Sequence, residues 1–333
     1  QGVSSAASDV YKRQVGTGFN GANDLVYVYK VQPDGKILVG GDFNDYNSNS
    51  VYSLCRLNPD GSLDNTFILP ASTIIDYKVS AIDLLPDGRI VVGGKFSNSY
   101  TNYFVILNSD GTANQQFPSP YGFDDDVQDI KVQSDGKIII GGKFTTFNGI
   151  SAKGIIRLNS NGTVDTTFVY GTGFDNSVNG SVWSIAIESD GNILCGGEFT
   201  VYNGVSCNRL IRLDTNGNVL NTFGIGADDR VQKITLQSDG KILLGGRFQN
   251  FNLTSTNYMV RLTQSGVIDT TFDFDNYVNY IYVQNDGRLL VGGQFNNYQS
   301  INYNYFIRLN PSGSIDSSFY YYNDFDNYVN TCL

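Results

Sequence analysis

The segment VQPDGKILVGGDF, residues 31–43, has the pattern of a β-hairpin: an apolar strand end, an Asp-Gly turn, and a second apolar strand that ends in Gly-Gly-x-Phe. The sequence repeats it as VQSDGKIIIGGKF at 132–144 and LQSDGKILLGGRF at 236–248. The first glycine of the pair falls at Gly40, Gly93, Gly141, Gly196, Gly245 and Gly292, in steps of 53, 48, 55, 49 and 47 residues. A period near 50 with a few residues of variation is typical of a solenoid or a propeller.

Each of these six repeats contains four strand-like phrases. The first alternates apolar and polar residues, as in 127–133, and an Asp-Gly turn joins it to the second, which ends in the glycine pair. The third resembles IIRLN at 155–159, and another glycine turn leads to the fourth, such as TVDTTF at 163–168. Short alternating segments bounded by glycine turns indicate strands, and no helical period is present.

Four antiparallel strands in each of six repeats predict an all-β fold, a β-propeller built from six four-stranded repeats. The six blades form either a whole ring or part of a larger or seven-bladed ring. Because the glycine pair removes two side chains from the second strand, we expect another backbone or a large ring to pack closely there. The main rival is a parallel β-helix, whose coils are usually shorter and lack two hairpin turns at fixed places.

The phrases VQ-x-DGKI-x-GG-x-F and RLN-x-DG-x-x-D-x-x-F resemble the delta-60 repeat of bacterial and phage proteins. The resemblance runs from about Leu25 to Phe319 and covers all six repeats. Repeat 2 departs from it with Ile106 for Arg and Asn114 for Asp, and repeat 4 has Leu220 for Asp. The resemblance implies a propeller and, in many relatives, secretion or surface display, but it transfers no catalytic residue.

The two ends differ from the repeats. Residues 1–14 match no repeat and resemble translated adapter sequence, whereas 15–333 are predicted to form the propeller with six repeats and a terminal partial repeat. The last residues, FDNYVNTCL at 325–333, resume the first-strand phrase FDNYVNYIY of 274–282. Two interpretations stay open: the chain is a fragment of a longer protein with neighbouring domains or subunits, or the extra strand overlaps the two ends of a closed six-bladed ring.

The amino-acid composition excludes several classes of partner and of active site. The 333 residues include 22 Lys and Arg against 32 Asp and Glu, a net charge of −10, which argues against nucleic-acid or membrane-surface partners. Apolar runs are far shorter than the roughly 20 residues of a membrane span, and no signal-peptide pattern is visible. The chain has no histidine, so Ser-His-Asp and Cys-His nucleophiles and His-bearing metal sites are excluded.

Acidic residues cluster at the turns. NPDGSLD at 58–64 has the oxygen spacing of part of a calcium loop, but sister turns lose these acids, so we interpret them as turn residues. Acids are denser at 124–126 and 228–229, where calcium remains an alternative. No cofactor is predicted.

The third phrase carries an arginine in five repeats, and an aspartate follows eight residues later in four of them. These residues are Arg56, Arg157, Arg212, Arg261 and Arg308, with Asp64, Asp165, Asp269 and Asp316. A ring of guanidinium groups could bind an anion, but the spacing across a hairpin favours a pair inside each repeat.

Three of the four cysteines, Cys55, Cys195 and Cys332, take positions that are apolar in sister repeats, so we expect them to be buried. Cys207 lies in a loop phrase and is predicted to be exposed. A disulfide framework is not indicated.

The segments after Gly-Gly-x-Phe vary between repeats and are rich in Asn, Ser and Tyr, a composition typical of binding loops. The candidate anchors for a partner are Tyr46, Tyr52, Tyr100, Tyr103, Tyr202, Tyr298 and Tyr303. The residue before each Phe also varies, as Asp42, Lys95, Lys143, Glu198, Arg247 and Gln294, and we expect this row to line one exposed face. For any single loop, a tyrosine packed on its own blade is the alternative.

These observations predict a non-catalytic β-propeller scaffold for binding or structural assembly that meets a protein or glycan partner. The resemblance implies an extracellular, cell-surface or virion-associated location. The alternative is a propeller enzyme of the lactonase or lyase type with a carboxylate or calcium site in its central channel.

Overall fold

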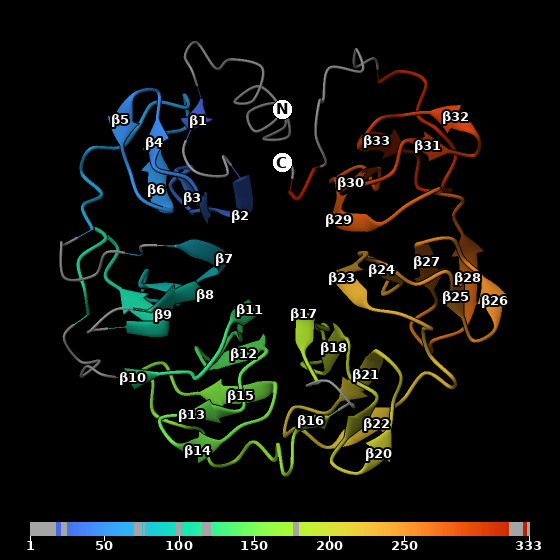
Figure 1. Cartoon of the computed structure of the whole chain (residues 1–333), viewed down its shortest axis with the longest axis horizontal. Coiled ribbons are helices and arrows are strands. Elements are labelled where there is room, and N and C mark those ends of the chain that lie inside the picture. Colours follow the sequence, from blue (N-terminus) through green and yellow to red (C-terminus); the bar gives the residue numbers. More distant parts are fainter. Residues whose placement is uncertain are drawn as a thin grey trace. The chain divides into compact units, whose positions relative to one another are not determined.

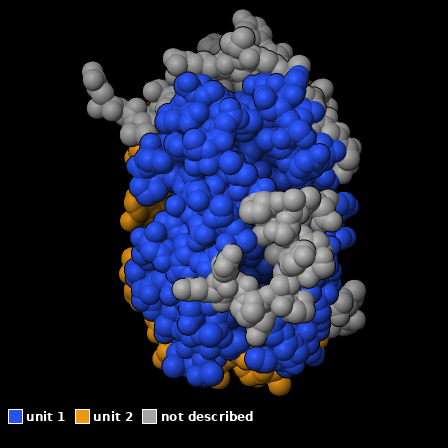
Figure 2. Space-filling model, turned by 90° about the vertical axis from the view of Figure 1, so that its left-hand side faces the viewer, with its two compact units in different colours: residues 1–168 blue, residues 169–333 orange. Residues whose placement is uncertain are grey.

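A computed structural model describes residues 18–20, 25–69, 75, 77–97, 101–114, 121–175, 180–319 and 329–331. All regular elements within these ranges are β-strands, which confirms the all-β prediction. None of the ranges contains a helix that could span a membrane. The chain divides into two compact units, Gln1–Phe168 and Val169–Leu333, which are coloured separately in Figure 2.

Unit 1 contains the sheets of repeats 1 to 3, which follow one another along the chain (Figure 1). Their strands pair antiparallel in the order of the phrases. They are β2 (Leu25–Val31), β3 (Ile37–Asp42) and β6 (Leu54–Leu57) in repeat 1; β7 (Lys78–Leu84), β8 (Ile90–Ser97) and β9 (Thr101–Leu107) in repeat 2; and β11 (Val127–Val132), β12 (Ile138–Gly142) and β15 (Ile155–Leu158) in repeat 3. A short strand, β10 (Tyr121–Gly122), adds to β9 in parallel.

Unit 2 repeats the same arrangement in repeats 4 to 6. Its strands are β17 (Val182–Ile187), β18 (Ile193–Gly197), β21 (Leu210–Leu213) and β22 (Val219–Asn221) in repeat 4; β23 (Val231–Leu236), β24 (Ile242–Gly246), β27 (Met259–Leu262) and β28 (Ile268–Thr271) in repeat 5; and β29 (Val278–Val283), β30 (Leu289–Gly293) and β33 (Phe306–Leu309) in repeat 6.

Among the described residues, the fourth phrase forms a strand only in repeats 4 and 5. In the other four repeats it pairs with the third strand through a single bridge, such as Leu57 with Leu63. In repeats 1, 3 and 6 an aspartate follows the bridge and ends the strand, because its side chain binds the backbone two residues on: Oδ1 of Asp64 accepts from the amide of Thr66 at 3.0 Å.

The segment after Gly-Gly-x-Phe forms a small two-stranded hairpin in five repeats, where the sequence predicted only a variable loop. The hairpin strands are β4 (Asp45–Tyr46) with β5 (Asn49–Ser50), β13 (Thr146–Phe147) with β14 (Ile150–Ser151), β19 (Val201–Tyr202) with β20 (Val205–Ser206), β25 (Asn250–Phe251) with β26 (Thr254–Ser255), and β31 (Asn297–Tyr298) with β32 (Ile301–Asn302). In Figure 1 each of these hairpins lies beyond the third strand of its repeat, away from the first strand. Two short strands from the preceding segment, β1 (Phe19–Asn20) and β16 (Phe174–Asp175), extend the hairpins of repeats 1 and 4.

The close packing predicted at the glycine pair is confirmed. The two glycines have different neighbours: the first contacts the next repeat, and the second contacts the first strand of its own repeat. A Cβ built at Gly40 would stand 2.4 Å from Cγ1 of Val79 in the next repeat, so the first glycine admits the neighbouring sheet. A Cβ at Gly41 would stand 2.1 Å from the carbonyl oxygen of Leu25. That carbonyl approaches because the first strand has a bulge opposite the pair, between Val26 and Val28. The same bulge recurs in the other five repeats.

The apolar core lies between consecutive sheets of a unit. One cluster joins Leu38 and Leu54 of repeat 1 to Val79 and Val92 of repeat 2, and similar clusters join repeat 4 to 5 and repeat 5 to 6. A blade alone would leave one apolar face exposed, so stacking is what buries the sheets.

Candidate functional site

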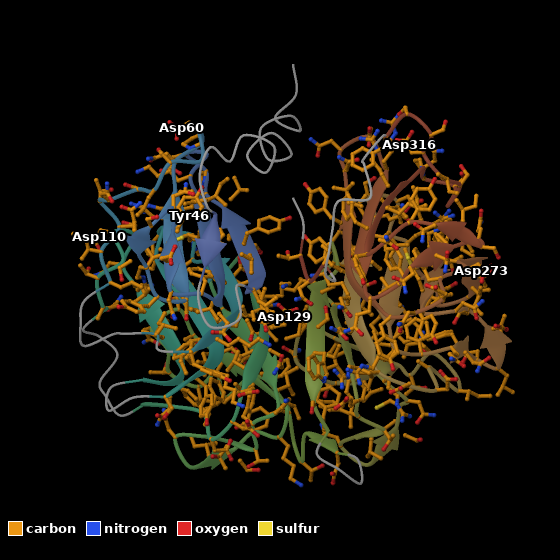
Figure 3. The ribbon with its side chains drawn as sticks, turned by 45° about the horizontal axis from the view of Figure 1, so that its top comes forward. Tyr46, Asp60, Asp110, Asp129, Asp273 and Asp316 are labelled. Atoms are coloured by element: carbon orange, nitrogen blue, oxygen red, sulfur yellow. The ribbon has the colours of Figure 1, made fainter. Side chains whose placement is uncertain are left out.

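Three of the predicted tyrosine anchors are buried in the hairpins. Tyr46, Tyr202 and Tyr298 are at most 2% exposed, and Figure 3 shows Tyr46 among the strands of unit 1. Each hydroxyl donates to the carbonyl of the glycine that turns the chain from the third phrase to the fourth, and Tyr46 reaches Gly61 at 2.7 Å. Burial raises the pKa of Tyr298 to about 12. These rings have the blade-packing role that was the alternative interpretation.

The other predicted tyrosines are scattered. Tyr52 is 52% exposed, whereas Tyr103 and Tyr303 are half-buried. Burial raises the pKa of Tyr103, with Asp125 and Asp126 acting in the same direction. Tyr100 lies outside the described residues. Of the six tyrosines that the structure describes, only Tyr52 is exposed, so they do not form the exposed set that the sequence predicted.

The arginines of the third phrase pair inside their repeats, as predicted. Nε of Arg56 lies 2.7 Å from Oδ2 of Asp64, and the equivalent distances in repeats 3, 5 and 6 are 2.7, 2.6 and 2.6 Å. The arginines also link successive repeats: Nη1 of Arg56 donates to the carbonyl of Ser109 at 2.6 Å. These guanidinium groups are part of the scaffold and do not form an anion-binding ring.

Repeats 2 and 4 lack the aspartate of this ion pair, and in both a second position changes with it. In repeat 4, where Leu220 replaces the aspartate, Glu188 supplies the carboxylate instead and lies 2.8 Å from Nε of Arg212. Glu188 stands where repeats 1, 3, 5 and 6 have Gln. In repeat 2 the arginine is replaced by Ile106 and the glutamine by Leu85, and both are buried. The chain thus keeps or removes the charges of a pair together.

The aspartates of the acidic turns accept hydrogen bonds from backbone amides with their carboxylate oxygens. Oδ1 of Asp60 accepts from the amide of Ser62 at 2.9 Å, and Oδ1 of Asp124 accepts from the amides of Thr145 and Thr146 at 2.8 Å. Asp60 and Asp110 lie at turns of unit 1 in Figure 3. Among the residues that the structure describes, no three acidic or cysteine side chains gather as a metal site would require.

The prediction for Cys207 is wrong. Its side chain is 1% exposed, because the end of the hairpin folds it into the core beside Tyr202, and burial raises the pKa of its thiol to about 12. Cys55 and Cys195 are buried as predicted, and Cys332 lies outside the described residues.

A recurring set of three positions forms the main variable surface. The x residue of Gly-Gly-x-Phe lies beside a residue at the start of the first strand, and the glycine before x pairs with the residue just before the LCRL-type phrase of the third strand. In repeat 5 the amide of Arg247 donates to the carbonyl of Arg230 at 3.0 Å, and the amide of Gly246 donates to the carbonyl of Tyr258 at 3.0 Å. We call these three positions a triad, and the surface they form within a unit the triad face.

The backbone of the triads is constant while the side chains differ in charge, size and polarity. The six triads are Leu25, Asp42 and Ser53; Lys78, Lys95 and Tyr103; Asp126, Lys143 and Gly154; Ser181, Glu198 and Arg209; Arg230, Arg247 and Tyr258; and Tyr277, Gln294 and Tyr305. At the x position, Lys95 is exposed and Asp42 is buried, and the other four residues are half-buried. The expectation of a fully solvated row is therefore only partly met, because these side chains pack against neighbouring triads.

The third position of every triad has a left-handed backbone. The φ angles are 55° at Ser53, 63° at Tyr103, 72° at Gly154, 64° at Arg209, 72° at Tyr258 and 66° at Tyr305. This conformation costs a side-chain-bearing residue roughly 1–2 kcal/mol, and glycine avoids the cost. Only repeat 3 has glycine here, so four repeats keep a tyrosine or an arginine at a position where the fold favours none.

Successive triads touch one another in unit 2. Nε of Arg230 donates to Oε1 of Glu198 in the preceding triad at 2.6 Å, and its guanidinium lies 4.0 Å from the centre of the Trp183 ring. In the other direction, Arg247 lies 4.9 Å from the centre of the Tyr277 ring. The rings of Tyr258 and Tyr277 meet edge to face at 5.6 Å. The face in unit 2 is therefore a continuous strip of arginines and aromatic rings.

In unit 1 the triads place lysines and acids together. Nζ of Lys143 lies 3.5 Å from Oδ2 of Asp126, and Nζ of Lys78 lies 4.0 Å from the centre of the Tyr27 ring. Burial lowers the pKa of Lys78, and Lys143 and Lys95 act in the same direction while Asp126 opposes them. The two units thus present different chemistry on the same backbone.

The sequence predicted the x position of each triad and, in repeat 2, also Tyr103 at the third position, and it missed the other triad residues. A signal for the third position exists, since the residue before each LCRL-type phrase varies, while an apolar residue always follows it and Asn precedes it in four repeats. The hairpins also had a signal: an aromatic residue followed by Asn or Gln recurs after the glycine pair, as in Phe147-Asn148 and Tyr202-Asn203.

Six segments of the chain match the DUF5122 beta-propeller family, a domain of unknown function, at residues 32–67, 85–117, 133–168, 188–223, 237–272 and 284–319. The chain belongs to this family. The match confirms the β-propeller prediction and six repeats, and each family segment ends at the phenylalanine that closes the fourth phrase. Among curated proteins, none matches the DUF5122 chain.

Solved structures agree on the fold. The WD40 beta propeller domain of Doa1 aligns with a TM-score of 0.58 at 14% identity, over 90% of this chain and 83% of that one. The extracellular domain of BT4673 from B. thetaiotaomicron aligns with a TM-score of 0.54 at 16% identity, over 87% of this chain. PorZ, a surface component of the type-IX secretion system of Porphyromonas gingivalis, aligns with a TM-score of 0.51 at 13% identity, over 85% of this chain. The DUF5122 chain spans only 34% of the BT4673 chain and 39% of PorZ.

Proposed function

We propose that this DUF5122 propeller is a non-catalytic binding scaffold whose triad face recognises a protein or glycan partner outside the cell or on a virion. The observation that carries the proposal is the third triad position, where tyrosine or arginine is kept in a left-handed conformation that glycine would adopt at lower cost. A side chain that the fold does not favour is best explained by contacts made outside the fold.

The composition of the face supports the same conclusion. Tyrosine and arginine, which dominate the triads of repeats 5 and 6, are enriched at the centres of protein interfaces. They are carried on β-strands whose backbone does not change from repeat to repeat, so a partner meets an ordered surface and little entropy is lost on binding.

The location rests on two kinds of support. The two recurring phrases resemble the delta-60 repeat, and that resemblance implies secretion or surface display in many relatives. BT4673 and PorZ are described as having an extracellular domain and as a bacterial surface component. An extracellular, cell-surface or virion-associated protein fits both.

The test removes the third-position side chains together. In the variant R209G/Y258G/Y305G, we expect the free energy of unfolding to stay within about 1 kcal/mol of the parent, because glycine relieves the left-handed strain. Binding should be measured for both proteins on one array of neutral and acidic oligosaccharides and one array of peptides. A ligand bound by the parent and lost by the variant supports the proposal.

The matched control is Y202F, which changes a buried hairpin tyrosine and should keep binding. Binding that survives the triple substitution, or a parent that binds nothing on either array, would contradict the proposal.

A further inference from the structure

The triad face of unit 2 contains a guanidinium group that the scaffold leaves without a carboxylate. Among the described residues no acid lies within ion-pair distance of Arg247, and its Nε is buried without a hydrogen-bond partner. The third-strand arginines differ sharply, since each pairs with an aspartate or glutamate of its own repeat. Arg247 is therefore not held by the contacts that the scaffold uses for its other arginines.

The neighbouring charges do not neutralise Arg247. Glu198 is engaged by Arg230, and Oδ1 of Asp229 accepts from the amide of Arg230 at 2.6 Å. The two arginines are adjacent, because the amide of Arg247 donates to the carbonyl of Arg230. Burial lowers the pKa of Arg230, and Arg247 lowers it further while Glu198 raises it. A bound anion beside Arg247 would relieve the repulsion between the two guanidinium groups.

The groups around Arg247 are neutral rings and hydrogen-bonding groups. Its guanidinium packs on Tyr277, whose edge contact with Tyr258 fixes both rings. The hydroxyl of Tyr258 is held by Nε2 of Gln249 at 2.8 Å. Gln294 belongs to the next triad and lies beside Tyr277, because its backbone N–H donates to the carbonyl of Tyr277 at 2.8 Å. Aromatic faces suit the C–H face of a pyranose, and amide side chains and phenol groups suit its hydroxyls.

We propose that Arg247 binds the carboxylate of an acidic sugar, with Tyr258, Tyr277 and Gln294 contacting the sugar ring and its hydroxyls. This inference rests on the proposed binding function and names its ligand class. The guanidinium fork presents its terminal nitrogens to both carboxylate oxygens, a geometry that lysine cannot reproduce. The net charge of −10 disfavours a polyanion, so the acid is expected as a single residue in an otherwise uncharged glycan.

The experiment compares two ligands that differ only at one carbon: methyl glucuronide, which has a carboxylate, and methyl glucoside, which has a hydroxymethyl group. Affinities are measured by NMR titration of the full chain. We expect the parent to bind the glucuronide at least tenfold more tightly than the glucoside. The R247Q variant should lose that preference and R247K should keep only part of it.

The control is R89Q, which removes one positive charge at the Asp-Gly turn of repeat 2, outside the triad face, and should leave the preference unchanged. Thermal unfolding of all variants separates loss of binding from loss of fold. Equal affinity for the two sugars in the parent, no binding of either sugar, or an undiminished preference in R247Q would overturn the inference.

A third ligand separates the source of the carboxylate. A tripeptide with a free C-terminus, bound in preference to its amide and to both sugars, would assign Arg247 to peptide carboxylates and overturn the sugar proposal. If the parent binds array ligands through its triad face without any carboxylate preference, only this inference fails. If it binds no ligand at all, the proposed function fails with it.

Discussion

Gly93 and Val127 belong to successive repeats, and a Cβ at residue 93 would stand 2.4 Å from Cγ1 of Val127. A Cβ at Gly40 would stand 2.4 Å from the equivalent valine of the following repeat, and a Cβ at Gly196 would stand 2.7 Å from its own. Within each unit, the first glycine of the pair is thus the point at which one sheet packs against the next. This contact cannot relax easily, because Val127 has a short side chain on a strand and cannot move away as the end of a long flexible side chain could.

We therefore expect Gly93→Ala to lower the free energy of unfolding by about 1–3 kcal/mol, the usual cost of overpacking a well-packed core. Urea unfolding followed by tryptophan fluorescence measures the change. Gly149→Ser serves as the control, because no heavy atom lies within 4 Å of a Cβ at Gly149 and sister hairpins hold Ser48 and Ser300 at φ 64° and 63°. Equal losses for the two variants would show that the Gly93 contact is not specific.

The exchange of partners around Arg212 gives a second prediction. Glu188→Gln should destabilise the chain by about 2 kcal/mol, because a hydrogen bond between charged groups is lost and Arg212 is largely buried. Adding Leu220→Asp restores the arrangement of repeats 3, 5 and 6, in which the fourth phrase supplies the acid. The double variant should then recover most of the lost stability, and a double-mutant cycle measures the coupling. Additive losses would contradict the exchange.

Acid sensitivity follows from the same aspartates. Hydrogen bonds from Ser318, with Arg308 beside them, lower the pKa of Asp316 to about 2 from its usual 3.8, and the pKa of Asp269 is lowered by Arg261. Burial alone would raise the pKa of Asp165, but hydrogen bonds from Thr167 and Lys137, with Arg157, outweigh it and lower the pKa.

A pKa that is lower in the folded state stabilises the fold above the unfolded pKa, and this contribution is lost as pH falls through the folded pKa. Stability should therefore be flat between pH 7 and 5 and fall between about pH 4 and 2. Urea midpoints measured across this range test the expectation. Asp316→Asn should shrink the loss in that window, and a loss that begins near pH 6 would point to other groups.

The sequence predicts the parts of the fold that depend on local pattern. Asp-Gly turns, the alternating first strand and the Arg56–Asp64 pair each leave a signature within a few residues, and each is confirmed. The small hairpins were missed because their strands are two residues long, too short for an alternating pattern to be visible. Their stability comes from contacts distant in sequence, such as Tyr46 with Gly61 and the ring of Phe19 at 4.6 Å.

The candidate site was predicted only in part for a related reason. The x positions can be found in the sequence because they lie inside Gly-Gly-x-Phe, the most regular phrase of the repeat. The triad also depends on the strand bulge that brings Arg230 beside Arg247. A bulge depends on how two strands pair, which residue types alone do not specify. Tyrosine content pointed to the right segments, but three of the tyrosines it named, Tyr46, Tyr202 and Tyr298, lie in the core, since ring size suits a core as well as an interface.

The buried tyrosines supply the last prediction, because repeats 3 and 5 carry Phe147 and Phe251 where repeat 4 has Tyr202. The hydroxyl of Tyr202 donates to the carbonyl of Gly217 at 3.0 Å, so Tyr202→Phe removes one buried hydrogen bond and should cost about 1 kcal/mol. Tyr202→Ala also removes the ring from its contact with Phe174, 4.5 Å between ring centres, and should cost about 3–5 kcal/mol.

Neither change should alter the affinity for methyl glucuronide while the chain stays folded. Unfolding curves and the NMR titration on the same samples check both statements, and a Tyr202→Phe variant that keeps its stability but loses binding would return this ring to the list of partner anchors.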